Sequence, residues 1–188
     1  MGRWEPNARG RLEQAALDLY GEHGFEQTTV AEIAERAGLT ERTFFRYFVD
    51  KREVLFSGAS SLEQFLVGIV AGAPEQDRPI EAVATAIASV ADFFQERREF
   101  TLRRQSVIGT NTELQERELI KLATLTAAIA EALRRRGVRE PSASLAAEAG
   151  IAVFKISFER WISGNDESNF SQIVHEHFDE LRVVTTGC

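Results

Sequence analysis

Apolar residues along this chain recur mainly at the spacing of a helical face. Hydrophobic side chains return at positions i, i+3, i+4 and i+7, which is typical of an amphipathic α-helix with one buried side. No segment shows the sustained alternation of a half-buried strand. The pattern therefore predicts an all-α fold of about nine helices. Its clearest stripes are Leu12–Tyr20, Leu62–Val70, Ile80–Phe94, Leu119–Leu133 and Phe170–Leu181.

The character of the predicted helices changes near residue 56. Before it they are short, closely spaced and capped, and after it they are long and joined by loops. We therefore expect a small amino-terminal module at residues 1–56 and a larger helical domain at 57–188. Asp50 and Glu53 have a capping spacing, so a helix is predicted to begin near Lys51 and to cross this boundary unbroken. Such a helix would couple the two parts mechanically.

Residues 24–51 contain two short helices joined by a glycine turn. Thr29 and Glu32 have the spacing of a capping box at the start of the first helix. Gly38 ends it, because only glycine turns so sharply at no steric cost. Thr40 caps the helix that follows. Two short helices joined in this way form a helix-turn-helix.

The second of these helices has an apolar side and a polar side. Phe44 and Phe48 are spaced to pack inward, which leaves polar and guanidinium groups outside, as base readout requires. Lys51 lies where its ammonium could meet a phosphate, aided by the dipole of the predicted next helix. Glu41 is either an acceptor for cytosine N4 or a first-turn acid favoured by the helix dipole. The outer side carries Glu41, Arg42, Thr43, Arg46 and Tyr47.

The charge of the chain limits how it could bind DNA. The net charge is −7, which argues against non-specific coating of nucleic acid. Residues 1–56 hold 8 Lys and Arg against 10 Asp and Glu, a net charge of −2. Binding must therefore rely on the local placement of a few cations: Arg3, Arg9, Arg11, Arg42, Arg46, Lys51 and Arg52.

The amino-terminal segment resembles the TetR family of transcriptional regulators over about residues 9–56. The likeness rests on an ordered string of motifs at residues 15–19, 24–25, 28–30, 33–34, 37–40, 43–48 and 50–51. The resemblance implies a homodimer that binds operator DNA, with a carboxy-terminal domain that binds a small effector. It also implies phosphate or base contacts from Thr29, Thr40, Arg42, Thr43, Arg46, Tyr47 and Lys51.

Two features refine this resemblance. Phe45 occupies a position that is often a tyrosine whose hydroxyl meets a phosphate, so that contact is absent or replaced by apolar packing against sugar or a thymine methyl. Residues 43–48, together with the larger domain, also resemble an actinobacterial branch that includes the mycofactocin-type regulators. That branch implies an acyl-CoA or fatty-acyl effector.

The larger domain is rich in aromatic residues. Each of them alone is best explained as core, but the family resemblance favours a cavity for a bulky apolar ligand. Arginines around Phe100 form either a solvated face paired with glutamates or a cationic mouth for a carboxylate or phosphate group. The candidate effector-binding residues are Phe65, Phe94, Arg97, Phe100, Phe154, Phe158 and Trp161.

Residues 142–162 and 168–184 form the predicted dimer surface. Small side chains on the first segment permit close helix approach, and a sharp apolar stripe marks the second. The alternative is that both helices cover the core of their own chain. The candidate interface residues are Ala146, Gly150, Phe170, Val174, His177, Phe178 and Leu181.

The sequence contains no signature of an enzyme. It has no nucleophile elbow, phosphate loop or dinucleotide fingerprint. His175 and Asp179 have a chelating spacing but no third ligand, which favours a surface pair over a metal site, and the single Cys188 excludes a cysteine metal cluster. No apolar run approaches the roughly 20 residues of a membrane helix. We expect a cytoplasmic, non-enzymatic regulator without cofactor or metal: a homodimeric repressor released from a palindromic operator by a hydrophobic effector. The alternative is a small-molecule-binding or interaction protein of the same fold without sequence-specific DNA binding.

Overall fold

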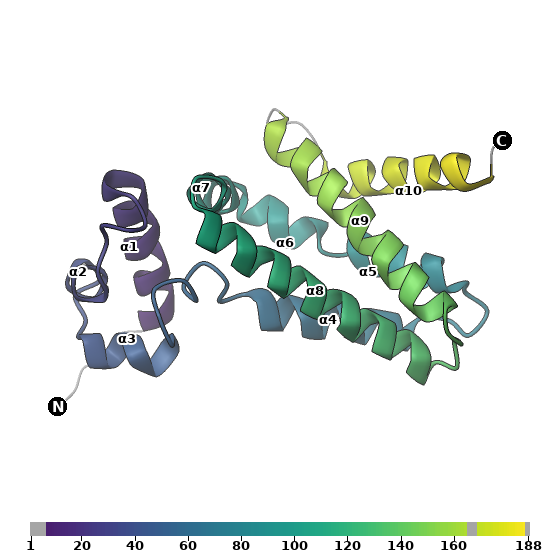
Figure 1. Ribbon diagram of the computed structural model, residues 1–188, viewed down its shortest axis with the longest axis horizontal. Helices are drawn as coiled ribbons and strands as arrows, with labels where there is room; N and C mark the ends of the chain where they lie inside the picture. The colour runs from purple at the N-terminus through teal and green to yellow at the C-terminus, as the bar shows by residue number, and fades with distance from the viewer. Residues whose placement is uncertain (1–6, 165–168, 187–188) are drawn as a thin grey trace. The chain divides into compact units, whose positions relative to one another are not determined.

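The computed structural model describes residues 7–164 and 169–186, and within them it contains helices and turns but no strand. The all-α prediction is therefore confirmed (Figure 1). The helices of the described part are α1 (Ala8–His23), α2 (Val30–Arg36), α3 (Glu41–Tyr47), α4 (Ala59–Gly72), α5 (Pro79–Ala88), α6 (Ala91–Glu96), α7 (Arg98–Gly109), α8 (Thr112–Arg135), α9 (Ser142–Ser163) and α10 (Phe170–Thr186).

The chain divides into two compact units. The first consists of Met1–Ala59 and Glu99–Glu118, and so combines α1, α2 and α3 with α7 and the first turns of α8. The second consists of Ser60–Arg98 and Leu119–Cys188 and holds α4 to α6, the rest of α8, α9 and α10. One continuous helix, α8, thus contributes residues to both units.

Local capping interactions set the limits of α2 and α3. The Thr29 hydroxyl accepts a hydrogen bond from the Glu32 amide at 3.2 Å, and the Glu32 carboxylate accepts one from the Thr29 amide at 2.7 Å. Gly38 has φ +64°, the left-handed conformation that glycine adopts without strain. Thr40 accepts from the amide of Thr43 at 3.2 Å and caps α3. The predicted capping box and glycine turn are confirmed.

The predicted helix from Lys51 is wrong, because residues 51–58 form turns and α4 begins only at Ala59. Asp50 does cap this segment: its Oδ1 accepts from the amides of Arg52 at 2.8 Å and Glu53 at 3.1 Å. The residues that follow are three consecutive buried apolar side chains, Val54, Leu55 and Phe56. A helix spreads three consecutive side chains over about 200° of its circumference, so burial of all three favours an irregular backbone.

Residues 99–118 pack on the core of the helix-turn-helix. Val107, Ile108 and Leu114 are buried in the same hydrophobic cluster as residues of α1 and α3. Polar contacts across the first unit add to this packing: Arg103 to Asp18 at 2.5 Å, Arg117 to Glu53 at 2.7 Å, Asn111 to Glu26 at 2.8 Å, and Arg52 to Glu113.

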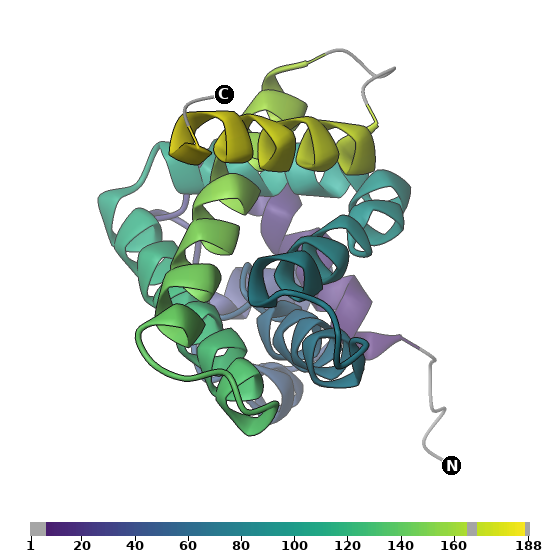
Figure 2. The same ribbon diagram turned by 90° about the vertical axis from the view of Figure 1, so that its right-hand side faces the viewer.

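In the second unit α5, α9 and α10 pack against one another around the main core, and Figure 2 shows the yellow α10 crossing the light-green α9. Gly150 on α9 permits this close approach. A Cβ atom there would overlap Val83 Cγ1 and would lie 3.3 Å from Ile87 Cδ1. The sequence of α9 therefore has a small residue where α5 crosses it.

Candidate functional site

The outer side of α3 carries two unshielded guanidinium groups, four residues apart. Arg42 and Arg46 are both exposed, and Phe44 beneath them is fully buried. Within the described residues Arg42 has no hydrogen bond or ion pair, and the Arg46 guanidinium contacts only its neighbour Tyr47. Both groups are therefore available to a ligand in front of α3.

Most other cations of the module are engaged by the protein itself. Arg9 donates to the carbonyl of Ser57, and Arg11 donates to the carbonyl of Ala37. Arg52 pairs with Asp50 at 2.6 Å and also with Glu113. Arg3 lies outside the described residues. Among the described cations of this expected set, those not bound to a carboxylate or a backbone carbonyl are therefore Arg42 and Arg46, on the outer side of α3.

Lys51 is placed differently from the other candidate DNA contacts. Its Nζ donates to the carbonyl oxygens of Phe25 at 2.8 Å, Glu26 at 3.2 Å and Thr28 at 2.9 Å. It also lies 4.5 Å from the centre of the Phe25 ring. The helix whose dipole was expected to assist it does not begin here. A phosphate contact from Lys51 stays a prediction, and it would have to displace one of these carbonyls.

The remaining candidate DNA contacts lie on or beside the same surface. Thr29, Thr40 and Glu41 are exposed, and Thr43 is half-buried with its hydroxyl 3.0 Å from that of Thr40. Because Thr29 and Thr40 already cap helices, their hydroxyls are held in fixed positions. Glu41 lies in the first turn of α3, as either interpretation of it requires.

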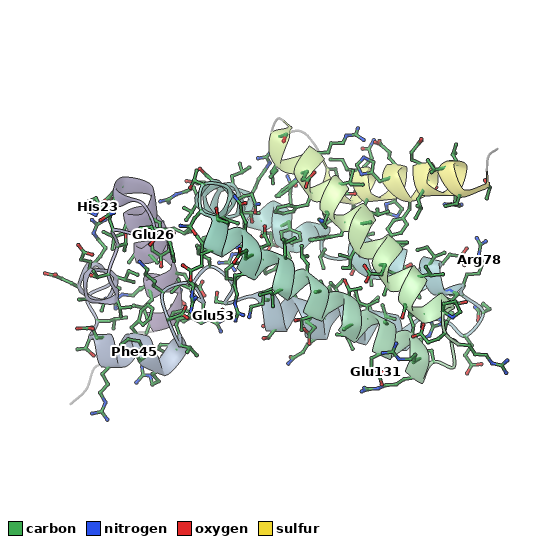
Figure 3. The ribbon with its side chains drawn as sticks, viewed as in Figure 1. His23, Glu26, Phe45, Glu53, Arg78 and Glu131 are labelled. Carbon is green, nitrogen blue, oxygen red and sulfur yellow. The ribbon has the colours of Figure 1, made fainter. Side chains whose placement is uncertain are left out.

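Phe45 exposes 54% of its surface on α3, and Figure 3 labels it there. Its ring packs edge-on against Phe44, with the centroids 5.4 Å apart and the planes at 83°. The ring is therefore fixed on one side by the core and open on the other. The open side of the ring lies next to the exposed arginines of α3.

Four of the candidate effector residues come together in the second unit. The Phe94 ring lies 6.0 Å from Phe154, 5.5 Å from Phe158 and 6.2 Å from Trp161, measured between centroids. Phe170, which the sequence assigned to the dimer surface, completes this aromatic cluster. Trp161 is fully buried, and its Nε1 has no hydrogen-bond partner among the described residues.

The other three effector candidates do not join the aromatic cluster. Phe65 exposes half of its surface, and Phe100 packs against the core of the first unit. Arg97 is exposed, with its guanidinium 5.7 Å from the ring of Phe93.

A groove of about 490 Å³ lies between α8 and α9, where the sequence predicted no site. Small residues recur at helical spacing on both helices and leave this space open. That pattern in the sequence could have indicated the groove. Its walls include Leu119, Leu122, Ala123, Ala127, Ile151 and Ala152.

The candidate dimer residues lie mostly inside the protomer. Ala146, Gly150, Phe170, Val174 and Phe178 are buried in the core of their own chain, as the alternative interpretation holds. His177 and Leu181 are half-buried. The exposed large apolar side chains of these two helices are Leu145, Ile156, Val183 and Val184. In the sequence, the helical spacing of Leu145, Ala149, Ala152 and Ile156 could have indicated this exposed apolar side of α9.

The described residues contain neither a candidate metal cluster nor a candidate membrane span. No group of three or more potential metal-ligating side chains is present in them. None of their helices is long and apolar enough to cross a membrane.

Comparison with known proteins gives two families and several relatives. The chain is 34% identical over 82 residues to the HTH-type transcriptional regulator TcmR of Streptomyces glaucescens, a match over 44% of this chain and 36% of that protein. It is 26% identical over 136 residues to MftR of Mycobacterium tuberculosis, named as a mycofactocin biosynthesis transcriptional regulator, over 72% and 69% of the two chains. The match thus spans about a third of TcmR and about two thirds of MftR.

Solved structures show the same fold. The fatty acid degradation regulator FadR from Bacillus halodurans superposes with a TM-score of 0.64 at 20% identity, over 95% of this chain and 98% of that one. FadR from Bacillus subtilis in complex with stearoyl-CoA gives 0.59 at 18% identity over the same shares. Residues 13–57 match the family of bacterial regulatory proteins named for TetR, and residues 77–185 match the MftR C-terminal domain. The chain therefore belongs to the TetR family of bacterial transcriptional regulators, with a carboxy-terminal domain of the MftR type.

Proposed function

We propose that this regulator is a homodimeric cytoplasmic repressor that binds a palindromic operator and is released by a hydrophobic effector. The observation that carries the proposal is the pair of guanidinium groups on the outer side of α3. Arg42 and Arg46 project from a capped helix-turn-helix whose other cations are mostly engaged internally. Arginine is the side chain best suited to bidentate contact with guanine O6 and N7 in the major groove.

The small number of available cations favours sequence readout over electrostatic coating. Non-specific affinity grows with the number of phosphates neutralised, and the chain as a whole carries −7. Two guanidinium groups on one half-site give little affinity for random DNA. Two half-sites bound together by a dimer would raise affinity only for a matching inverted repeat.

The exposed apolar side chains of α9 and α10 support dimerisation. Leu145 and Ile156 expose 64% and 57% of their surfaces, and Val183 and Val184 expose 49% and 73%. A two-fold axis would bring each such patch against its own copy, as closed dimers require. We therefore assign the interface to these exposed side chains of α9 and α10.

The aromatic cluster supports an apolar effector with an acceptor atom. The buried Nε1–H of Trp161 has no partner in the described residues, and an unpaired buried donor is costly. An acyl thioester would supply apolar surface for the rings and a carbonyl oxygen for this N–H. Two FadR structures with the same fold were solved in complex with lauroyl-CoA and stearoyl-CoA, which supports acyl-CoA as the first class to test.

Communication between effector and DNA is best assigned to α8. The break between residues 51 and 58 removes the continuous helix expected from the sequence, whereas α8 has residues in both units. On the first unit Arg104 donates to the Leu55 carbonyl at 2.6 Å and pairs with Glu118 on α8 at 3.0 Å. A shift of α8 would therefore act on the segment that directly follows α3.

Selection from a random duplex pool, followed by salt-titrated affinity for the winning sequence, tests this function. We expect an inverted repeat, bound far more tightly than random DNA, and loss of enrichment in an Arg42→Ala/Arg46→Ala double variant. Acyl-CoA thioesters should weaken operator binding and change the fluorescence of Trp161 in a Trp4→Phe background, whereas free coenzyme A should not. Absence of enrichment with and without acyl-CoA would favour the alternative, a ligand-binding protein that does not read DNA sequence.

A further inference from the structure

Lys51 is bonded to the protein by both its side chain and its backbone. Its ammonium has three N–H donors, and the three carbonyl oxygens of Phe25, Glu26 and Thr28 lie 2.8, 3.2 and 2.9 Å from Nζ. The Lys51 carbonyl accepts a hydrogen bond of 2.6 Å from the buried hydroxyl of Tyr20 on α1. The donor capacity of the ammonium is therefore fully used within the chain.

The three carbonyls belong to the connection between α1 and α2. This connection starts at Gly24, with φ +84°, and ends at Thr29, the N-cap of α2. Its own hydrogen bonds are few: the Thr28 amide reaches the Phe25 carbonyl at 3.4 Å, and the Thr28 hydroxyl reaches the Gly24 carbonyl at 2.9 Å. The connection has no turn pattern that would satisfy all of its carbonyls by itself.

The Phe25 side chain supports the same arrangement. Its ring is buried, lies 5.3 Å from the Tyr20 ring in an edge-on contact, and has the Lys51 ammonium 4.5 Å from its centre. A cation over an aromatic face is stabilised, and the more so away from water. Tyr20, Phe25 and Lys51 thus fix the connection from inside the module.

We propose that Lys51 is a positioning residue, whose ammonium holds the α1–α2 connection and so sets where α2 begins, and that it is not a phosphate contact. It joins the segment after α3 to the start of α2, and thereby fixes the two helices of the helix-turn-helix relative to each other. The consequence for DNA is indirect, through the placement of Thr29 and of α3. The DNA measurements that test this inference rest on the proposed operator binding. The loss of stability expected when Lys51 is substituted does not.

Two substitutions separate positioning from phosphate binding. Lys51→Met keeps the apolar stem and removes the ammonium. Lys51→Arg keeps the positive charge, and so would keep a phosphate contact, but a planar guanidinium cannot direct three donors from one nitrogen atom. Arg42→Ala serves as the matched loss of an exposed cation that has no partner in the described part of the chain.

The experiment measures thermal melting of the full chain without DNA, then affinity for the selected operator at several salt concentrations. Both Lys51 variants should melt lower by about 5 °C, and should weaken operator binding by about tenfold at every salt concentration, with the slope of log K against log salt unchanged. Arg42→Ala should keep the wild-type melting temperature while it weakens operator binding, since it removes a base contact and no contact within the protein.

Three results would overturn the proposal. One is a wild-type melting temperature for Lys51→Met, which needs no DNA and is independent of whether an operator exists. Another is a reduced salt slope in Lys51→Met that Lys51→Arg restores, which would identify a phosphate contact. The last is full recovery of stability by Lys51→Arg, which would show that charge alone suffices. Failure to find any operator would instead count against the proposed function, and the melting data would still decide the role of Lys51.

Discussion

The Nη2 atom of Arg46 lies 3.1 Å from the hydroxyl oxygen of Tyr47, and the guanidinium lies 4.9 Å from the centre of the same ring. Adjacent residues on a helix usually point apart, so this contact requires the two side chains to fold toward each other. The hydroxyl accepts from Arg46 and keeps its own proton as a donor. The remaining N–H groups of Arg46 and the O–H of Tyr47 are therefore hydrogen-bond donors held in a restricted orientation, and they can bind acceptor atoms of a ligand.

Arg46→Ala should weaken operator binding by about 1–3 kcal/mol, and should weaken binding to random duplex by much less, because only the operator presents a base edge for bidentate contact. Tyr47→Phe should weaken operator binding less than Arg46→Ala does, since it removes the hydroxyl that accepts from Arg46 but keeps the ring beside the guanidinium. Parallel titrations of operator and random duplex measure both. Arg182→Ala, which removes an exposed arginine paired with Asp179 on α10, is the control. Equal losses on both DNAs would show that Arg46 contacts phosphate only.

Phe45 offers a distinct test, because its open ring face is suited to the methyl group of thymine. Replacing one operator thymine by deoxyuridine removes only that methyl, and should cost wild-type protein roughly 0.8 kcal/mol at the contacted position. In Phe45→Ala the same replacement should cost nothing further. Phe45→Tyr, which keeps the ring, should retain the thymine effect.

The comparison is made position by position along each half-site. Deoxyuridine outside the half-sites is the matched control for altered DNA stiffness. A thymine effect of equal size in wild type and Phe45→Ala would exclude a contact between that methyl and Phe45, and would leave sugar packing as the role of the ring.

The features that the sequence predicted correctly are those determined by neighbouring residues. Thr29 with Glu32, the left-handed Gly38 and the N-cap Thr40 each act within four residues along the chain. The side chains of Thr29, Glu32 and Thr40 contact backbone amides of the same short segment, so spacing alone identifies them. The buried Phe44 follows in the same way from the period of a helix.

The features that the sequence did not predict depend on distant partners. Burial of residues 54–56 involves α7 and α8, which pack on the module from more than 40 residues away. The carbonyls around Lys51 come from residues 25–28, and no spacing rule relates them to it. Small residues such as Gly150 indicated a close helix contact, but not whether the partner was α5 or a second chain.

Gly150→Ala should therefore destabilise the second unit, although alanine favours a helix. Its methyl group would overlap Val83 Cγ1 and crowd Ile87 Cδ1 at 3.3 Å. Overpacking of this kind costs about 1–3 kcal/mol. Gly68→Ala on α4 is the matched control, since a Cβ there meets no atom within 4 Å. That change should stabilise by up to about 1 kcal/mol, from helix propensity alone.

Denaturant unfolding of the full chain measures both changes. Val83→Ala in the Gly150→Ala background should recover part of the loss, because it removes the overlapping methyl group. If Gly150→Ala is as stable as Gly68→Ala, then α5 and α9 are not packed as closely as described, and the assignment of Gly150 to the protomer core fails.

His177 should make the folded state less stable in mild acid. Its Nδ1 lies 2.9 Å from the buried Ser157 hydroxyl, and its Nε2 lies 3.3 Å from Nη1 of Arg160, which acts as the donor. Burial and the Arg160 charge lower the pKa of His177 below its ordinary 6.5, although Glu176 and Glu180 oppose this. The neutral ring is therefore the form that the fold favours. Its contribution to stability is present above about pH 6.5, and is lost as the pH falls through the lowered folded-state pKa.

Melting temperatures at about pH 7.5 and about pH 5.5 measure this loss. Other groups of the chain also change charge as the pH falls, so the informative quantity is the difference between wild type and His177→Gln. Glutamine cannot become charged, and we expect the variant to lose less stability than wild type between the two pH values. His175→Gln, at an exposed position two residues away, should behave as wild type. A drop in His177→Gln as large as that in wild type would show that protonation of His177 does not disturb the contact between α9 and α10.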